Sequence, residues 1–234
     1  MSVPVAVFAS GGGTNFQSLL DHQTPEGDWE IRLLISDRAE AGALERAAKY
    51  GAEARVIPVK GRPTGDVARE TLEVLEELGI QVVLLAGYLR LVPAEVVRAF
   101  RRRILNIHPA LLPAFGGKGM WGRRVHEAVL ASGASFSGPT IHYVDEEYDT
   151  GSILAQWPVP VLADDTPDSL AARVLKVEHI LYPAAVDHLC RWIARGEPAP
   201  PFSLPGLGMA VREAFSPEET ARQIQAGFGL GEAG

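Results

Sequence analysis

The sequence predicts an α/β protein built on a doubly wound, mostly parallel sheet. Apolar runs of strand length alternate with helix-length amphipathic segments from residue 3 to residue 107. The run Ile80–Ala86 (IQVVLLA) is apolar without alternation, which is typical of a parallel strand covered on both faces. Because crossovers between parallel strands are right-handed, this repeated β-α order gives a sheet with helices on both faces.

Nine elements follow in order along the first half of the chain. We expect strands at Val3–Ala9, Ile31–Ser36, Glu53–Val59, Ile80–Ala86 and Arg103–Ile107. Helices are expected at Asn15–His22, Ala41–Tyr50, Asp66–Leu78 and Pro93–Phe100. Gly51 is placed to end the second helix as a left-handed cap. The most apolar strand, Ile80–Ala86, is expected at the centre of the sheet.

The second half begins with a loop rich in proline and glycine, residues 109–122. A helix at Arg124–Ser132 and strands at Thr140–Val144 and Ile153–Val161 follow. Thr166 as N-cap, with Pro167 at the first helical position, opens a long helix to Ala194. We therefore expect one domain over 1–196, followed by a C-terminal extension, 197–234, with a proline-rich linker and a short helix that a capping box opens at Ser216–Glu219.

Composition excludes several classes of protein. The chain has 234 residues, 47% of them hydrophobic and 22% charged, as in soluble globular proteins. Acidic residues outnumber basic ones by 29 to 22, the wrong sign for a main partner that is a nucleic acid or an anionic membrane. The single cysteine, Cys190, excludes an internal disulfide, and no secretory signal or membrane-spanning run is present. We expect a cytoplasmic protein with small-molecule substrates and a core thiol.

A glycine-rich turn, Ser10–Asn15 (SGGGTN), follows the first strand and opens a helix. Backbone N–H groups at a helix start suit a phosphate. The dinucleotide fingerprint fails because Phe16 stands where a third small residue is needed, and the P-loop lysine is absent. The residues alone leave two interpretations open: a site for a phosphate other than a dinucleotide, or a tight turn chosen for packing.

A second group of polar residues ends the fifth strand, at Asn106 and His108. Alternation along a strand puts both on one face, at the sheet edge that also carries the glycine turn. An amide donor beside an imidazole suits acyl transfer through a tetrahedral intermediate, although a lone histidine is often structural. One carboxylate of the acidic turn 145–151 could raise the pKa of His108, but position alone does not select Asp149. The histidine spacing matches no metal-site motif, so a metal-free reaction is expected.

Four segments together resemble the phosphoribosylglycinamide formyltransferase family. They are 8–17 (FASGGGTNFQ), 85–90 (LAGYLR), 104–113 (ILNIHPALLP) and 145–151 (DEEYDTG). The last two motifs are shared by several enzymes that use formyltetrahydrofolate, whereas the glycine turn points to the glycinamide ribonucleotide branch. The resemblance runs to Tyr182–Pro183 and implies a Rossmann-like formyltransferase fold.

The resemblance also implies a reaction, a co-substrate and a set of site residues. The formyl group of 10-formyltetrahydrofolate would pass to the amine of 5'-phosphoribosylglycinamide, in purine (IMP) biosynthesis, without a metal. The implied catalytic residues are Asn106, which holds the formyl oxygen, His108, a protonated acid and proton shuttle, and Asp149, which keeps His108 charged.

The implied ribonucleotide-binding residues are Gly12, Gly13, Thr14, Asn15 and Glu178. The implied folate-binding residues are Leu89, Arg90, Leu91, Val92, Asn106 and Asp145, with Thr140 and His142 on a flanking strand. Residues 1–100 would form the phosphate-binding half and 101–196 the folate-binding and catalytic half of a monomer or homodimer.

The sequence departs from the family in three places. The arginine that many members use for the folate tail has no match at 63–67, so either Arg62 or Arg69 substitutes for it or nothing does. The loop 115–124 is longer than the family's form, with Trp121 as a candidate lid residue, and the residues after Gly196 match nothing in the family.

Three alternative functions have their own discriminating features. A formyltetrahydrofolate deformylase normally carries an N-terminal regulatory domain, whereas the first strand here starts at Val3. A methionyl-tRNA formyltransferase needs a basic C-terminal domain, whereas 197–234 holds only Arg212 and Arg222 and no lysine. A non-catalytic sugar-phosphate binding module would not need Asn106, His108 and Asp149 together.

Overall fold

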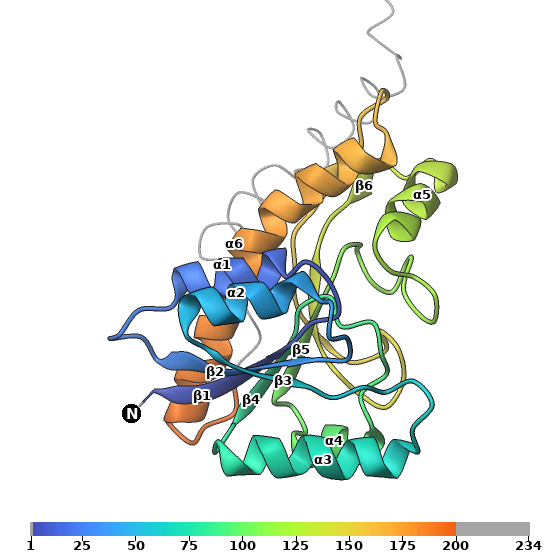
Figure 1. Ribbon diagram of the computed structural model, residues 1–234. Coiled ribbons are helices and arrows are strands. Elements are labelled where there is room, and N and C mark those ends of the chain that lie inside the picture. Colours follow the sequence, from blue (N-terminus) through green and yellow to red (C-terminus); the bar gives the residue numbers. More distant parts are fainter. Residues whose placement is uncertain (1, 200–234) are drawn as a thin grey trace, which may run out of the picture. The chain divides into compact units, whose positions relative to one another are not determined.

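The computed structural model describes residues 2–199 and confirms the predicted fold class (Figure 1). Seven strands form one sheet in the order β3-β2-β1-β4-β5-β7-β8. The strands are β1 (Val3–Phe8), β2 (Trp29–Ser36), β3 (Glu53–Val56), β4 (Val82–Leu85), β5 (Ile104–His108), β7 (Thr140–Tyr143) and β8 (Ile153–Gln156). β1 to β5 are parallel, and β7 and β8 are antiparallel to their neighbours. β4, the most apolar predicted strand, lies at the centre.

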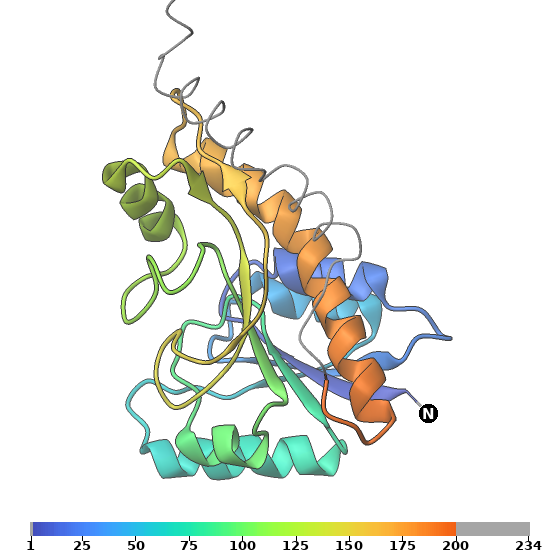
Figure 2. The ribbon, with the colours of Figure 1, turned by 180° about the vertical axis from the view of Figure 1, so that it is seen from behind.

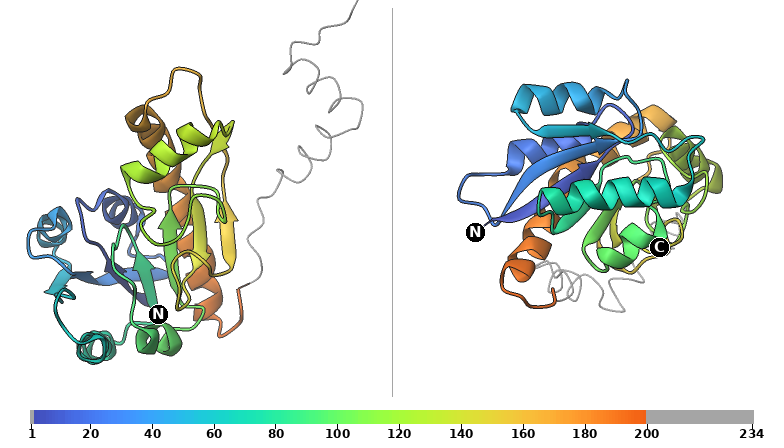
Figure 3. Two further views of the ribbon diagram at one scale, coloured as in Figure 1. Left: turned by 90° about the vertical axis from the view of Figure 1, so that its right-hand side faces the viewer. Right: turned by 60° about the horizontal axis from the view of Figure 1, so that its bottom comes forward.

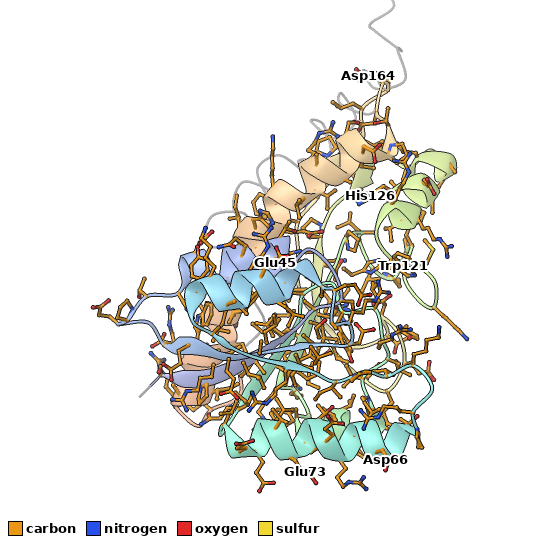
Figure 4. All side chains as sticks on the ribbon, in the orientation of Figure 1. Glu45, Asp66, Glu73, Trp121, His126 and Asp164 are labelled. Carbon is orange, nitrogen blue, oxygen red and sulfur yellow. The ribbon has the colours of Figure 1, made fainter. Side chains whose placement is uncertain are left out.

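Helices cover both faces of the sheet. They are α1 (Thr14–His22), α2 (Gly42–Tyr50), α3 (Thr64–Glu77), α4 (Ala94–Ala99), α5 (Arg123–Ser132) and α6 (Pro167–Ala194). α1 and α2 lie on one side of the strands and α3 and α4 on the other (Figure 3). Seen from behind, α6 runs the length of the sheet beside α1 (Figure 2). Charged side chains such as Asp66 and Glu73 on α3 point away from the sheet (Figure 4).

Proline ends two strands earlier than the sequence pattern predicted. The predicted strand Ile153–Val161 is two strands, β8 and β9 (Val159–Pro160), separated at Pro158, and β9 pairs with an unpredicted strand, β6 (Phe136–Ser137). β3 stops at Val56 because Pro58, two residues on, has no N–H to donate. The paired segments of β6 and β9 have only two residues each, too short for a recognisable alternation.

The long helix α6 begins as predicted. The Thr166 side chain accepts from the Ser169 N–H, the Ser169 side chain accepts from the Thr166 N–H, and Pro167 occupies the first helical position. Cys190 is fully buried in this helix, as predicted for a core thiol. Within residues 2–199 no helix is long and apolar enough to cross a membrane. The predicted helix at 216–225 and nearly all of the C-terminal extension lie outside the described residues.

Candidate active site

A cavity of about 640 Å³ opens at the carboxyl ends of β4 and β5, beside the start of α1. In parallel sheets this edge carries the ligand crevice. Residues from six segments far apart in the sequence line it: 14–15, 85–92, 106–109, 117–126, 142–149 and 171–178. The sequence-predicted residues Thr14, Asn15, Leu89, Arg90, Leu91, Val92, Asn106, His108, Asp149 and Glu178 are all in this lining.

The glycine turn between β1 and α1 packs tightly against its neighbours. Gly13 has φ +72°, and a Cβ there would lie 2.8 Å from the Cβ of Ala43, so a side chain is excluded. The Ser10 hydroxyl accepts from the Leu89 N–H at 2.9 Å, which ties the turn to the segment after β4. Gly12 and Gly13 shape the turn without lining the cavity, while Thr14 and Asn15 line it. The first residues of α1 present N–H groups that have no acceptor within the helix.

Asn15 and Glu178 join the turn to α6. The Asn15 Nδ2 donates to a Glu178 carboxylate oxygen at 2.6 Å, although the two residues are 163 positions apart. Burial raises the pKa of Glu178, and the Asn15 hydrogen bond acts in the opposite direction. The Asn15 Oδ1 is buried and has no protein partner among the described residues, so this amide oxygen is available to accept a hydrogen bond from a ligand.

Strand register places Asn106 directly opposite His142, on β7. Opposite residues of an antiparallel pair share a face of the sheet. The His142 Nδ1 lies 2.9 Å from the Tyr143 carbonyl oxygen, which can only accept, so this nitrogen carries the hydrogen. The His142 Nε2 then accepts from the Asn106 Nδ2 at 2.9 Å, and this hydrogen bond orients the amide.

The loop after β7 turns back sharply and brings Asp149 into the site. A Cβ on Gly151 would lie 1.8 Å from the Tyr143 carbonyl oxygen, so only glycine permits this fold-back. Asp149 itself has φ +59°. Of the four carboxylates in this turn, only Asp149 approaches Asn106 and His108. The Asp145 carboxylate instead accepts from the Glu147 N–H and the Thr150 hydroxyl, which stabilises the turn, and it is not in the cavity lining.

Four groups surround the Asp149 carboxylate. Its Oδ1 lies 3.4 Å from the Asn106 Nδ2 and 3.6 Å from the His142 Nε2. Its Oδ2 accepts from the Gly117 N–H at 2.8 Å and lies 3.6 Å from the His108 Nδ1. Burial alone would raise the pKa of Asp149, but the Gly117 N–H and, in their protonated forms, the His142 and His108 rings hold that pKa below its usual value. The carboxylate is therefore charged at neutral pH.

His108 is 3% exposed, and its Nε2 lies 2.9 Å from the Phe115 carbonyl oxygen. Burial lowers the pKa of His108, and although the Asp149 carboxylate and the Phe115 carbonyl act in the opposite direction, the pKa stays below its ordinary value. Burial and the Asp149 carboxylate thus act on the pKa of His108 in opposite directions, and the role of Asp149 in keeping this imidazole charged stays a prediction. Both ring nitrogens face oxygens that can only accept: in the charged ring both donate, whereas in the neutral ring Nε2 carries the hydrogen and the Nδ1 lone pair faces Asp149.

Arg90 in the segment after β4 is held by a buried acid. Its Nε donates to the Asp37 carboxylate at 2.7 Å, and the Asp37 side chain is 0% exposed. Asp37 directly follows β2, where dinucleotide-binding folds place the acid that contacts a ribose. Here that acid is committed to Arg90, which agrees with the failed dinucleotide fingerprint.

Neither candidate for the missing folate-tail arginine lies in the cavity lining. Arg62 pairs with Glu70 at 2.6 Å, and Arg69 pairs with Asp66 at 2.9 Å. Both arginines belong to the surface around α3. The cavity lining therefore gives no support to either arginine as the substitute.

The loop between β5 and α5 supplies contacts that the sequence did not predict. The Phe115 carbonyl and the Gly117 N–H are backbone groups, so no side-chain pattern announces them. Trp121, labelled in Figure 4, is half exposed in this loop. It lines the cavity, and the Arg124 guanidinium lies 5.4 Å from its ring centre. His126 on α5 also lines the cavity and is 4% exposed, with a buried Nδ1 that has no partner among the described residues.

Buried histidines make the stability of the fold sensitive to acid. Burial lowers the pKa of His126, with His108 adding to the effect, so the unfolded chain binds a proton at a higher pH than the native state does. We expect the free energy of unfolding to fall as the pH drops below about 6.5, the pKa of histidine in an unfolded chain. Substitution of His126 by Gln should make the fall smaller. Urea unfolding at pH 7.5 and 5.5 measures this, and an equal fall in both proteins would contradict it.

In the described part of the chain no three or more His, Cys, Asp or Glu side chains are grouped to hold a metal ion.

Known proteins share both the sequence and the fold. The formyl transferase family model matches residues 3–186. The chloroplastic phosphoribosylglycinamide formyltransferase of Vigna unguiculata is 51% identical over 192 residues, which are 80% of this chain and 60% of that protein. The Arabidopsis thaliana protein of the same name is 49% identical over 201 residues, 83% of this chain and 69% of that protein. The crystal structure of phosphoribosylglycinamide formyltransferase from Brucella melitensis superimposes with a TM-score of 0.74 at 40% identity, over 81% of this chain and 96% of that chain.

Proposed function

This chain belongs to the phosphoribosylglycinamide formyltransferase family of formyl transferases, and on that premise we propose that it transfers a formyl group from 10-formyltetrahydrofolate to the amine of 5'-phosphoribosylglycinamide. The chain spans 60% and 69% of the length of the two plant relatives. One observation carries the proposal: Asn106, His108 and Asp149 converge in a single cavity that Thr14, Asn15 and Glu178 also line.

The ribonucleotide is proposed to bind along the α1 end of this cavity. Its phosphate would accept from the backbone N–H groups of Gly13, Thr14 and Asn15, where the positive end of the α1 dipole favours an anion. The Glu178 carboxylate, already held by Asn15, would accept from ribose hydroxyls. In this orientation the glycinamide amine points toward β5.

The folate is proposed to bind along residues 89–92. These residues line the cavity, and the Ser10 and Asp37 contacts fix their backbone and the Arg90 side chain. Backbone groups in an extended segment can pair with the edge of a heterocycle. The formyl group would then lie beside Asn106.

The reaction we propose is direct attack of the amine on the formyl carbon. A new N–C bond forms, the carbonyl oxygen takes negative charge in a tetrahedral intermediate, and the bond from carbon to N10 of the folate then breaks. The Asn106 Nδ2 has one firm hydrogen bond, to His142, and one long contact of 3.4 Å, to Asp149. A substrate oxygen can replace the longer contact and be stabilised there as an oxyanion.

One proton must pass from the attacking amine to N10 as the transfer proceeds. The Nδ1 lone pair of neutral His108 can accept this proton, and the Asp149 carboxylate 3.6 Å away then stabilises the imidazolium. Delivery of the same proton to N10 restores neutral His108 and leaves tetrahydrofolate and the formylated ribonucleotide as products.

The test is an incubation of the purified protein with both substrates, followed by mass spectrometry. We expect tetrahydrofolate and formylglycinamide ribonucleotide in equal amounts, and no folate product when the ribonucleotide is omitted. Tetrahydrofolate and formate without the ribonucleotide would indicate a deformylase. Formylation of methionyl-tRNA in a parallel reaction would indicate a methionyl-tRNA formyltransferase. No turnover in any reaction would indicate a non-catalytic binding module.

A further inference from the structure

We propose that Arg46 on α2 is a positioning residue for the ribonucleotide phosphate, acting through the glycine turn. The inference rests on the proposed function, because it assigns a role toward the phosphate of that substrate. Arg46 does not line the cavity, so it would act without touching the ligand.

Two successive carbonyl groups of the turn, those of Gly11 and Gly12, accept hydrogen bonds from α2. The Gly11 carbonyl accepts from the Ala43 N–H at 3.1 Å, and the Gly12 carbonyl accepts from the Arg46 Nε at 2.7 Å. In a planar trans peptide the C=O and the following N–H point in opposite directions. With its carbonyl held toward α2, the Gly12–Gly13 peptide therefore directs the Gly13 N–H away from α2. A turn that binds an anion needs its N–H groups on one side and its carbonyls on the other.

The guanidinium of Arg46 is itself fixed by a hydrogen-bonded group that joins α1 to α2. Its NH1 donates to the Gln17 side-chain oxygen at 2.9 Å. The Gln17 amide nitrogen lies 2.7 Å from the Tyr50 hydroxyl and 2.8 Å from the Asp21 carboxylate, and Tyr50 donates to Asp21 at 2.6 Å. One planar guanidinium thus donates to both the turn and α1. The ammonium group of a lysine, a compact point charge, would bridge the two less well.

Close packing leaves no room for a side chain between the turn and α2. A Cβ on Gly13 would lie 2.8 Å from the Ala43 Cβ and 3.4 Å from the Arg46 Cδ. The turn therefore lies directly on the N-terminal part of α2, with the arginine stem beside it. A charged donor on a peptide carbonyl also polarises that peptide, which makes its N–H a stronger donor to an anion.

The experiment compares Arg46→Met with the wild type on two substrates, the ribonucleotide and the same molecule without its phosphate. For the ribonucleotide we expect the Met variant to raise KM about 10- to 100-fold, the range for loss of a charged hydrogen bond, with kcat and the folate KM nearly unchanged. For the dephosphorylated substrate, kcat/KM should be the same in both proteins. Arg46→Lys should recover part of the affinity, because its charge remains but the bridge to Gln17 is lost.

Arg55→Met is the matched control, since Arg55 is a surface arginine on β3 that pairs with Glu53. We expect it to behave as the wild type on both substrates. Equal kinetics of Arg46→Met and wild type would overturn the Arg46 proposal alone. An equal loss on both substrates would also overturn it, because that pattern is the one a general structural defect produces. If the wild-type protein makes no product from the ribonucleotide, the proposed function is wrong, and the Arg46 proposal that rests on it is wrong as well.

Discussion

Substitution of His108 by alanine is expected to lower turnover about 1000-fold, within the range typical for loss of a general acid–base group. The ring is buried, and its Nδ1 faces the Asp149 carboxylate at the end of the cavity where the amine and formyl group are proposed to meet. Single-turnover kinetics with saturating substrates measures the chemical step. Ribonucleotide affinity should stay nearly unchanged, because the groups proposed to bind the ribonucleotide lie at the α1 end.

Two further measurements make this expectation specific to His108. His22→Ala is the control, because His22 is an exposed histidine on α1 that pairs with Asp187 outside the active-site cavity. We expect it to keep wild-type turnover. If His108→Ala instead abolishes ribonucleotide binding, His108 holds the ligand or the loop at Phe115, and the assigned proton transfer is wrong.

Substitution of Asn106 by alanine is expected to lower kcat about 100- to 1000-fold, as removal of an oxyanion donor does in other acyl-transfer enzymes. The substrate KM values should change little, since the interaction strengthens only as negative charge develops on the oxygen. Steady-state kinetics with each substrate varied in turn measures both quantities. A loss of less than tenfold in kcat would contradict the role of Asn106 as the oxyanion donor.

Asn106→Ala also removes the hydrogen bond to His142, so a variant of His142 is needed to separate the two effects. If Asn106→Ala acted only by releasing His142, the variants His142→Asn and Asn106→Ala would lose the same activity, and the double variant would lose no more. We expect the Asn106 effect to be the larger one, because His142 only orients the amide that contacts the substrate.

The sequence predicted the fold class, the central strand and the caps of α2 and α6 because each has a local physical cause. Ile80–Ala86 is apolar on both faces, and Thr166 with Pro167 forms a helix start that needs no tertiary contact. The strand β6 was missed because two residues cannot show alternation, and β9 was included with β8 in one predicted strand. The role of Pro158 in ending β8 follows from its missing N–H and could have been predicted.

The candidate site was predictable in part. Period-two alternation placed Asn106 and His108 on one face, but it could not select Asp149 among four carboxylates. That selection depends on the fold-back at Gly151, and it came from the motif resemblance. The contacts from the Phe115 carbonyl and the Gly117 N–H belong to the backbone, and the position of Arg46 depends on how α2 packs against the turn.

The antiparallel pairing of β5 with β7 determines where residues can be inserted or deleted without disrupting the site. Asn106 and His142 share a face only in the present register, and a slip of one residue would send His142 to the opposite side of the sheet. Insertions within β7 or between His142 and Asp149 would therefore separate the groups around the carboxylate. The connection 109–139 lies outside this constraint over most of its length, so it is the part of the site that can gain or lose residues while the register of β5 and β7 is kept.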